Sequence, residues 1–384
     1  MIFMKIAHIV STFPPIIGGM GQVCLEEIKL LAERGHNITA FTLLYKNRHS
    51  ESSLFDKNFS AGISTRRLKP FLKIGDAGWT PKLFFKLKGF DIAHLHYPFY
   101  GGAQCVFLAK IFNGQKYVLT YHMDASPSGL IKKILQAIYD AVWAKRILLG
   151  AEKIITVDKE YFLQTKYAGA IDKNKVVEIP NGVDAEVFCP RAVDLAKIGL
   201  EKFANKKIIL FVGNAMPIKR LDLLIDAYKS LSDGDAVLTI VGGGYKIKKY
   251  KKMAENLGLA EKIIFAGLCS DKNKLSEYYN AARCLVVPSE SESFSLVAVE
   301  AMACGCPVVG SDAPGIRGRI DNGIDGFLFK SGSAEGLADK LRKVLSLSEE
   351  ERKKMGEAGR KKAMEKYGWK KHVDELEKIY FLYK

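Results

Sequence analysis

The sequence of 384 residues predicts an α/β protein with two domains, and three observations support this fold class. Short apolar runs rich in isoleucine and valine alternate with longer amphipathic stretches, which is typical of parallel strands connected by helices. This alternation restarts near residue 207. A chain of this length also usually exceeds one hydrophobic core. We therefore expect two Rossmann-like domains that face each other across a cleft.

Each half of the chain supplies its own series of strands and helices. In the first half, helices follow strands as in βα units, and in the second half the same alternation leads into helices that continue to the C-terminus. The expected strands are 5–10, 37–44, 91–95, 117–121, 153–157, 207–212, 236–241, 262–265, 284–287, 307–309 and 326–329, and the main helices are 22–34, 129–149, 221–230 and 296–303.

Turn signals concentrate between the two series, in Ile-Pro-Asn-Gly-Val-Asp at 179–184. Proline, Asn-Gly and aspartate all favour turns, so we place the domain boundary here, with domains at 1–182 and 183–368. The last segment, 369–384, has apolar residues near helical spacing and is expected to be a helix. The pattern leaves open whether this helix packs back on the first domain.

The composition is that of a globular protein with an excess of positive charge. Hydrophobic residues make up 48% and charged residues 26%, which excludes disordered and fibrous classes. The 58 basic and 42 acidic residues give a net charge of +16, which favours anionic partners such as nucleic acid, phosphorylated metabolites or an acidic membrane surface. No nucleic-acid-binding motif occurs, so nucleic acid is not expected as a partner.

Cysteine usage and hydropathy indicate the compartment. Seven cysteines without a regular framework suggest reduced thiols that fill the core. The close pair Cys304 and Cys306 lacks further ligands at a workable spacing, so core packing is favoured over metal binding. The N-terminus reads as a strand rather than a signal peptide, and no apolar stretch approaches the roughly 18 residues of a membrane span. We expect a cytoplasmic protein, or one peripheral at the inner face of the membrane.

Glycines follow the first expected strand, at Gly18, Gly19 and Gly21, and lead into a helix. Glycine lets a backbone approach a phosphate closely, and a helix N-terminus supplies N–H donors. The spacing does not match the dinucleotide fingerprint, because Cys24 stands where its third glycine is required. The loop is therefore either a ligand loop or a tight structural turn.

A second turn after a strand, 213–220, contains Asn214 and ends in Lys219 and Arg220. Two cations there suit a diphosphate through charge-assisted hydrogen bonds. They oppose the helix dipole, so an anion site is favoured over a simple helix start, although a solvated helix start remains the alternative. Gly243, in a run of three glycines after the next strand, is another position where the backbone could come close to a ligand or to a neighbouring segment.

Two glutamates occur around the helix expected at 296–303. Glu292 precedes it, and Glu300 lies within its apolar residues. A carboxylate in such surroundings requires a partner, and sugar hydroxyls or a buried donor would serve. Ser293 or Ser295 can cap this helix, which would leave its amides free for a ligand.

Histidines end two strands of the first half. His122 follows the strand at 117–121, where structural and functional roles are equally open. His94 and His96 share one strand face with a spacing that could suit a metal. No carboxylate or cysteine is expected to complete such a site, so we favour a hydrogen-bonded core or a role in the acceptor cleft.

Taken together, these segments resemble retaining glycosyltransferases with two Rossmann-like domains, the GT-B fold, and specifically glycosyltransferase family 4. The similarity covers nearly the whole chain: the loop at 14–19, Thr-x-His at 120–122, the hinge at 179–184 and the strand and loop at 211–219. It is strongest at 287–309, which contains Glu292 and Glu300 in a Glu-x7-Glu spacing.

The resemblance implies transfer of a hexose or N-acetylhexosamine from a nucleotide-diphosphate sugar, such as a UDP- or GDP-sugar, to a glycan or lipid-linked acceptor. It implies no metal and no cofactor. Lys219 would neutralise the diphosphate, Glu300 would bind the ribose, Glu292 would contact the sugar and His122 would face the reaction centre. Further donor contacts are implied for Gly18, Gly19, Phe294, Ser295 and Leu296, and for the base near Gly267 and Leu268.

Two positions depart from the family pattern. Asn214 stands where the family usually has an arginine, for which Arg220 could substitute, and Ser295 stands where the family usually has a glycine. Both departures keep open an alternative function, a catalytically weak homologue that binds a sugar nucleotide or glycan.

The excess of positive charge lies mainly in the first domain. Residues 1–175 contain 24 basic and 13 acidic residues, whereas the remainder contains 34 and 29. Cations interleave with large apolar residues at 66–73 and 82–88, as in helices that bind membrane surfaces. We therefore expect an anionic membrane surface as a further partner, with an ordinary solvated helix face as the alternative.

Overall fold

The computed structural model describes residues 3–16, 18–45, 56, 59, 61–74, 77–124, 129–231 and 235–384. The chain divides into two compact units, here called unit 1 (Met1–Asn181 with Trp369–Lys384) and unit 2 (Gly182–Gly368). The expected boundary after residue 182 differs from this division by one residue.

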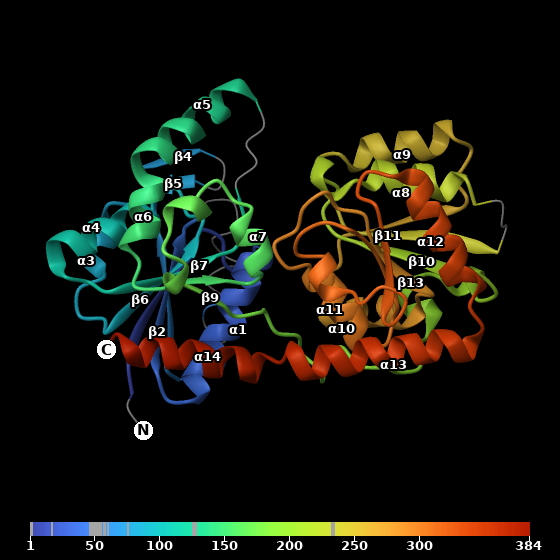
Figure 1. The fold of residues 1–384 in the computed structure, drawn as a ribbon. Helices are drawn as coiled ribbons and strands as arrows, with labels where there is room; N and C mark the ends of the chain where they lie inside the picture. The colour runs from blue at the N-terminus through green and yellow to red at the C-terminus, as the bar shows by residue number, and fades with distance from the viewer. Residues whose placement is uncertain are drawn as a thin grey trace. The chain divides into compact units, whose positions relative to one another are not determined.

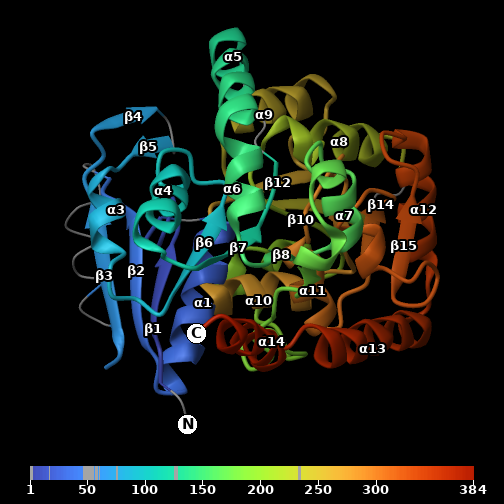
Figure 2. The same ribbon diagram turned by 60° about the vertical axis from the view of Figure 1, so that its left-hand side comes forward.

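Unit 1 contains a parallel sheet in the order β3-β2-β1-β6-β7-β8-β9 (Figures 1 and 2). The order reverses between the neighbouring strands β1 and β6, and ligands of such sheets bind where the order reverses. The central strands are buried on both faces, which explains their continuous apolar sequences. The strands are β1 (Lys5–Ile9), β2 (Asn37–Leu43), β3 (Ile63–Leu68), β6 (Ile92–Tyr97), β7 (Tyr117–Tyr121), β8 (Ile154–Thr156) and β9 (Val176–Glu178).

Helices and a small two-stranded sheet complete unit 1. The long helix expected at 129–149 is continuous but contains a π-helical segment, Asp140–Ala144, between α5 and α6. Strand β3, the β4–β5 pair and helix α4 were not expected from the sequence. The elements are α1 (Gly19–Glu33), β4 (Leu72–Ile74), β5 (Ala77–Trp79), α3 (Lys82–Lys86), α4 (Ala103–Asn113), α5 (Leu130–Tyr139), α6 (Lys145–Gly150), α7 (Lys159–Leu163) and α14 (Trp369–Leu382).

The C-terminal helix α14 belongs to unit 1, where it packs against α1 (Figure 1). Its apolar face is buried in a core that includes residues of β1 and α1. Polar contacts reinforce this packing: Arg34 pairs with Asp374 at 2.7 Å, and His36 pairs with Glu377 at 2.7 Å. The apolar pattern of 369–384 predicted the helix, and the structure identifies what it covers.

Unit 2 has a six-stranded parallel sheet in the order β12-β11-β10-β13-β14-β15 (Figure 2). This is the Rossmann order, with its reversal between β10 and β13. The two parallel sheets confirm the predicted fold class. The elements are β10 (Lys207–Val212), α8 (Leu221–Lys229), β11 (Ala236–Val241), α9 (Ile247–Asn256), β12 (Ile263–Gly267), α10 (Lys272–Ala281), β13 (Cys284–Val287), α11 (Leu296–Ala303), β14 (Val308–Ser311), β15 (Gly326–Phe329), α12 (Ala334–Ser346) and α13 (Glu349–Lys366).

Two further expectations are tested by the fold. Cys304 and Cys306 are buried in unit 2, and all seven cysteines are free thiols. None of the described helices combines the length and the apolar content that a membrane span requires.

Candidate active site

Two loops of unit 2 contain many of the residues that were expected to bind the sugar-nucleotide donor. These loops meet where the strand order reverses. One loop follows β10 and contains Lys219; the other follows β13 and contains Glu292. A backbone hydrogen bond connects the two loops: the N–H of Glu290 donates to the carbonyl of Ile218 at 2.9 Å. Both loops leave the carboxyl ends of adjacent strands, where ligands of Rossmann-type sheets bind.

An ion pair connects the side chains of these loops. Nζ of Lys219 lies 2.5 Å from Oε1 of Glu292, and both side chains are only partly exposed. The hydroxyl of Ser289 donates to the same carboxylate oxygen at 2.8 Å. Glu292 therefore holds the lysine in place at the mouth of the loops, where its remaining N–H bonds can meet an anion.

Arg220 was expected to substitute for the arginine that the family usually has at position 214, but its side chain has other partners. Its guanidinium pairs with Glu290 and with Asp222, the latter at 3.3 Å, so two carboxylates already neutralise it. Asn214 itself is exposed. Lys219 is paired with one carboxylate and Arg220 with two, so Lys219 keeps more uncompensated positive charge for a phosphate.

Close backbone contacts that the sequence did not reveal support the first loop. Gly213 and Gly242 approach so closely that a Cβ on Gly242 would lie 1.9 Å from the Gly213 carbonyl oxygen. The carbonyl of Gly243 accepts from the N–H of Ala215 at 2.5 Å, and a Cβ on Gly243 would lie 3.0 Å from Leu268. Leu268 is 65% exposed, so its apolar side chain is available for contact with a base.

The second loop is supported from β14 and from the segment after it. The hydroxyl of Ser311 donates to the carbonyl of Ser289 at 2.5 Å. Gly315 has φ of +74°, and a Cβ there would lie 2.1 Å from the carbonyl oxygen of Glu292. Sequence reasoning missed both residues, because they are distant from the loop along the chain.

Ser295 occupies the N-cap position of α11 but does not cap it through its side chain, which corrects that expectation. Its backbone is left-handed, with φ of 61° and ψ of 69°, and its buried Oγ has no hydrogen-bond partner within the described residues. Arg220, with φ of 48°, is the other described non-glycine residue with positive φ. Both lie in the two site loops, and strained backbone of this kind concentrates at functional sites.

The neighbours of Ser295 present backbone rather than side chains. Phe294 is 2% exposed, and its ring packs 5.6 Å from that of Tyr367 and beneath the Arg319 guanidinium. Leu296 is the first residue of α11, and the first N–H groups of a helix have no acceptor inside it. This geometry fits the expected role of the 294–296 amides, which is to donate to an anionic ligand.

Replacing Ser295 with glycine is expected to raise the free energy of unfolding by about 0.5–1 kcal/mol. A serine in the left-handed conformation costs roughly 1–2 kcal/mol of stability, and glycine removes this strain. The greater conformational entropy of glycine in the unfolded chain offsets part of that gain in stability. Denaturant unfolding would measure it. Ser293→Gly is the matched control, since Ser293 does not have positive φ and should not gain stability. Equal or opposite changes would show that Ser295 carries no relievable strain.

Glu300 lies inside α11 and accepts a hydrogen bond from the hydroxyl of Tyr279 at 2.8 Å. Desolvation by burial raises its pKa to about 7, although the Tyr279 hydrogen bond and Lys272 act in the opposite direction. Its side chain is still partly exposed. Near neutral pH, Glu300 is therefore divided between the carboxyl and the carboxylate form.

In unit 1, the glycines after β1 have separate roles. A Cβ on Gly21 would lie 2.6 Å from the carbonyl oxygen of Thr12, so packing requires this glycine. A Cβ on Gly18 would meet only Thr12 Oγ1, at an ordinary 3.7 Å. Gly18 and Gly19 stand at the N-terminus of α1. Among the described residues, nothing requires glycine at 18.

His122 directly follows β7 and is 4% exposed. Its Nε2 lies 2.9 Å from Nδ1 of His96, and its backbone N–H donates to the carbonyl of Tyr97. Desolvation by burial lowers the pKa of His122 to about 3, which keeps the ring neutral. His122 is thus fixed by His96, with Nδ1 as its remaining ring nitrogen.

The expectation that no carboxylate accompanies His94 and His96 is wrong. Glu27 of α1 places Oε2 3.6 Å from His94 Nδ1 and 3.5 Å from His96 Nε2. This contact could not be predicted from the sequence, because Glu27 belongs to a helix that follows a different strand. The expected hydrogen-bonded environment of both histidines is present: His94 contacts Thr120 and His96 contacts His122.

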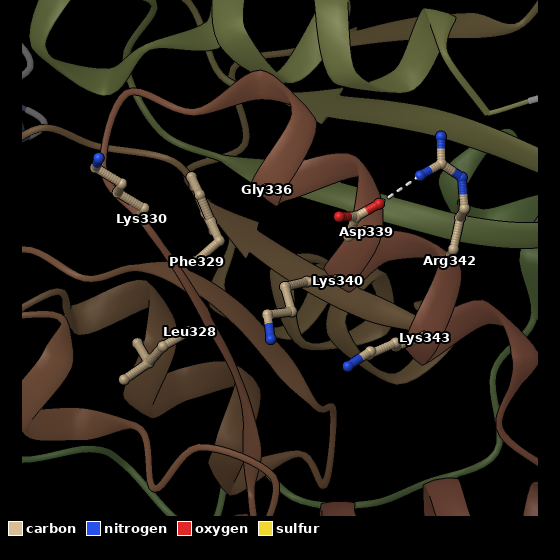
Figure 3. A pocket seen from close by; sticks show the side chains of 8 residues that line it. All are labelled: Leu328, Phe329, Lys330, Gly336, Asp339, Lys340, Arg342 and Lys343. Atoms are coloured by element: carbon tan, nitrogen blue, oxygen red, sulfur yellow. Dashed lines mark hydrogen bonds and ion pairs between the residues drawn. The ribbon is translucent and has the colours of Figure 1, made fainter.

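A separate basic hollow of about 550 Å³ lies between α12 and the end of β15 in unit 2 (Figure 3). Lys330, Lys340 and Lys343 line it, and Arg342 at its edge pairs with Asp339 at 2.6 Å. None of the expected site residues lines this hollow. It is therefore an alternative place for an anion in unit 2.

The chain was compared with known families and structures. The profile described as Glycosyl transferases group 1 matches residues 194–362, and Glycosyltransferase Family 4 matches residues 17–187. An uncharacterized glycosyltransferase of Methanocaldococcus jannaschii is 30% identical, over 99% of both chains. N-acetyl-alpha-D-glucosaminyl L-malate synthase of Bacillus anthracis is 27% identical, over 96% of this chain and 94% of its own length.

Among solved structures, Anabaena HepE in complex with UDP and glucose superimposes with a TM-score of 0.77 at 18% identity, over 98% of this chain and 99% of its own. This likeness extends the agreement in fold over both units. Together with the matched profiles and relatives, it identifies the chain as a glycosyltransferase of the GT-B fold that belongs to glycosyltransferase family 4.

Proposed function

We propose that this glycosyltransferase moves a hexose or N-acetylhexosamine from a nucleotide-diphosphate sugar to a glycan or lipid-linked acceptor, with retention of anomeric configuration. The observation that carries the proposal is the Lys219–Glu292 pair where the strand order of unit 2 reverses. The Bacillus anthracis relative is named for a glucosaminyl product, and the HepE structure holds UDP and glucose, which supports a donor of this class.

In the proposed mechanism, fixed protein charges stabilise the leaving diphosphate. Lys219 donates charge-assisted hydrogen bonds to it, and the amides of 294–296 add neutral donors at the start of α11. These contacts strengthen as negative charge develops on the leaving group, so they lower the barrier rather than merely bind the donor. We propose that no metal or cofactor takes part in this step.

The other residues orient the reactants. The Glu300 carboxylate accepts from the ribose hydroxyls, and Leu268 contacts the base. Glu292 contacts the sugar through the carboxylate that also holds Lys219. Gly18 and Gly19 allow close approach of the donor phosphate, and the neutral His122 ring faces the reaction centre. The acceptor attacks from the face that the diphosphate leaves, through a short-lived oxocarbenium-like state.

A donor panel tests the proposal. UDP-, GDP- and ADP-sugars are added to the full chain, and the melting temperature is measured, because a ligand that binds only the native state must raise it. We expect one nucleotide class to raise it and to support transfer with an α-configured product from an α-configured donor. Nucleotide binding without sugar transfer, for every donor and acceptor tested, would favour the alternative function, a catalytically weak homologue that binds a sugar nucleotide or glycan. Asn214 and Ser295 are the reason for considering this alternative.

We also propose that unit 1 binds an anionic membrane surface through α5. Of the two segments expected to resemble a membrane-binding helix, 66–73 falls on strands β3 and β4 instead, and 82–88 forms only the short helix α3, which buries Leu83 and exposes Phe85 at 75%. Helix α5 exposes a long apolar face and has no buried residue. Lys132 and Lys133 on the same helix supply positive charge for anionic lipid headgroups. Exposed apolar side chains of α5 are Leu130 (75%), Ile131 (76%), Ile134 (51%), Leu135 (46%) and Ile138 (57%).

The full chain is expected to sediment with phosphatidylglycerol vesicles at low salt. Ile131→Ser with Ile134→Ser should lower the bound fraction several-fold, because apolar area that enters the headgroup region is lost. Leu382→Ser, which changes an exposed leucine at the end of α14, is the matched control. Equal sedimentation of both variants, or none with the wild type, would remove α5 from the proposal.

A further inference from the structure

Five of the seven histidines gather in the interior of unit 1 around one buried glutamate. His8 lies on β1 and pairs in register with His94 of the neighbouring strand β6. His96 follows on the same face of β6, and Glu27 reaches the group from α1. The side chains of these four residues are 0% exposed. His122 and His372 contact the group from outside it.

The four side chains direct single donor atoms toward one another. Oε2 of Glu27 lies 3.6 Å from His8 Nδ1, 3.6 Å from His94 Nδ1 and 3.5 Å from His96 Nε2. His8 Nδ1 and His96 Nε2 are 3.1 Å apart, and all four atoms lie within 4.8 Å of one another. Tetrahedral zinc bonds of about 2.0–2.1 Å place neighbouring ligand atoms about 3.3–3.4 Å apart. Four of the six distances, at 3.1–3.6 Å, are close to that value, and the other two, from His94 Nδ1 to His8 Nδ1 and to His96 Nε2, are at most 4.8 Å.

Glu27 presents an oxygen that the surrounding protein does not satisfy. Oε1 lies 3.0 Å from Nε2 of His372, whereas Oε2 is fully buried and has no hydrogen-bond partner within the described residues. A buried polar atom in this position carries a cost of about 1–3 kcal/mol, and more when it is charged. A cation bound by Oε2 would remove that cost.

The opposite ring nitrogens have the outer partners that metal-bound histidines require. Nε2 of His94 lies 2.7 Å from Thr120 Oγ1, Nδ1 of His96 lies 2.9 Å from His122, and Nε2 of His8 lies 3.4 Å from the Tyr380 hydroxyl. In a metal site such contacts fix the tautomer and leave the inner nitrogen as a lone pair, so the present hydrogen bond between His8 Nδ1 and His96 Nε2 would be replaced by bonds to the metal. Burial also lowers the pKa of all three histidines, in agreement with neutral ligands.

Three hydrogen bonds of the ligand atoms must change on metal binding: that between His8 Nδ1 and His96 Nε2 at 3.1 Å, that between Cys24 Sγ and His8 Nδ1 at 3.9 Å, and one at His94. Nδ1 of His94 lies 2.6 Å from the Tyr380 hydroxyl, so this nitrogen would exchange that hydrogen bond for the metal. His8, His96 and Glu27 form the inner triad, and His94 is the fourth ligand that completes the tetrahedron.

We propose that His8, Glu27, His94 and His96 bind one Zn²⁺ ion in the interior of unit 1. Three imidazoles and a carboxylate, with no open position, suit a closed zinc site with a structural role. The ion would join β1, β6 and α1, and it would fix His122 through His96. This inference does not depend on the proposed transferase activity.

Metal content after refolding tests the proposal, because a fully buried ion must enter during folding. The untagged full chain is unfolded in guanidinium with a chelator and refolded with Zn²⁺, with Co²⁺ or with chelator alone. After desalting, we expect about one Zn²⁺ per chain by mass spectrometry and a higher melting temperature than without metal. Refolding with Co²⁺ should give the visible absorption of tetrahedral cobalt. Wild-type protein that retains no ion, with the same melting temperature in zinc and in chelator, would overturn the proposal.

Glu27→Gln keeps the shape of the side chain and removes the anionic ligand. We expect this variant to keep the far-UV circular dichroism of the wild type and to lose at least about tenfold in zinc affinity. His36→Gln is the matched control, because His36 is a buried histidine of unit 1 that contacts Glu377 rather than Glu27. Equal zinc retention by both variants would overturn the assignment.

X-ray absorption of the zinc-loaded wild type keeps the test decisive if Glu27→Gln fails to fold. We expect only nitrogen and oxygen neighbours with imidazole scattering. Sulfur neighbours would place the ion on cysteines and would contradict the proposed site.

Discussion

Lys219→Ala is expected to lower kcat for sugar transfer by about 10²–10³-fold, the usual effect of removing one preorganised donor from a developing negative charge. Lys219 is the cation that the loops of unit 2 hold at the carboxyl ends of β10 and β13, through the 2.5 Å contact with Glu292. Glu292 keeps its hydrogen bond from Ser289 in the variant, so the loop should remain folded. Initial rates with the donor identified by the panel would measure the effect.

Lys229→Ala is the control for loss of a lysine, because Lys229 is exposed in the last turn of α8. It should leave kcat unchanged. A melting temperature of Lys219→Ala close to that of the wild type would show that the loss is chemical rather than structural. Wild-type kcat in Lys219→Ala would contradict the assigned role.

Glu300→Gln is expected to weaken donor binding about tenfold at pH 8 and to remove its pH dependence. A charged acceptor gives hydrogen bonds of about 1.5–3 kcal/mol against about 0.5–1.5 for a neutral one. Because the pKa of Glu300 is about 7, the carboxylate form increases from pH 6 to pH 8. Wild-type donor affinity should therefore rise over this range and approach that of the variant at the acidic end. Calorimetric titrations at several pH values would measure both.

The same substitution should have the opposite effect on stability. Desolvation raises the folded-state pKa of Glu300 above its ordinary value of 4.5, so the folded chain binds this proton more tightly than the unfolded chain. The resulting stability is complete below about pH 4.5 and is lost as the pH rises through about 7. Wild type should lose on the order of 2 kcal/mol relative to Glu300→Gln over this range, a value reduced for partial exposure. A difference independent of pH would contradict the raised pKa.

The parts of the site that the sequence predicted are those governed by local rules. Lys219 and Glu292 each follow a recognisable strand, and loops at the carboxyl ends of adjacent parallel strands must lie close together. Their direct ion pair was not predicted, because it depends on the conformations of the two loops as well as on the topology. The closely packed backbones of Gly213 and Gly242, and the contact of Gly315 with Glu292, could not be predicted, because each joins segments far apart in the chain.

The buried group around Glu27 illustrates the same limit. Its histidines were visible as a strand pattern, but Glu27 is one glutamate in an amphipathic helix, where a solvated position is the ordinary interpretation. Similarly, the apolar residues of α14 predicted that one face of this helix is buried, but they did not predict which element it packs against. The periodicity of apolar residues predicts which face of a helix or strand is buried. The partner that covers this face is known only from the folded structure.

We propose that the nucleoside diphosphate binds at the loops that contain Lys219, rather than in the basic hollow lined by Lys340 and Lys343 (Figure 3). Calorimetric titration of UDP, with GDP and ADP in parallel, into wild type, Lys219→Ala and the double variant Lys340→Ala with Lys343→Ala tests it directly. We predict that the nucleotide bound by the wild type loses at least about tenfold in affinity in Lys219→Ala, the loss of one charge-assisted contact, and keeps wild-type affinity in the double variant. Binding retained in Lys219→Ala but lost in the double variant would contradict the claim.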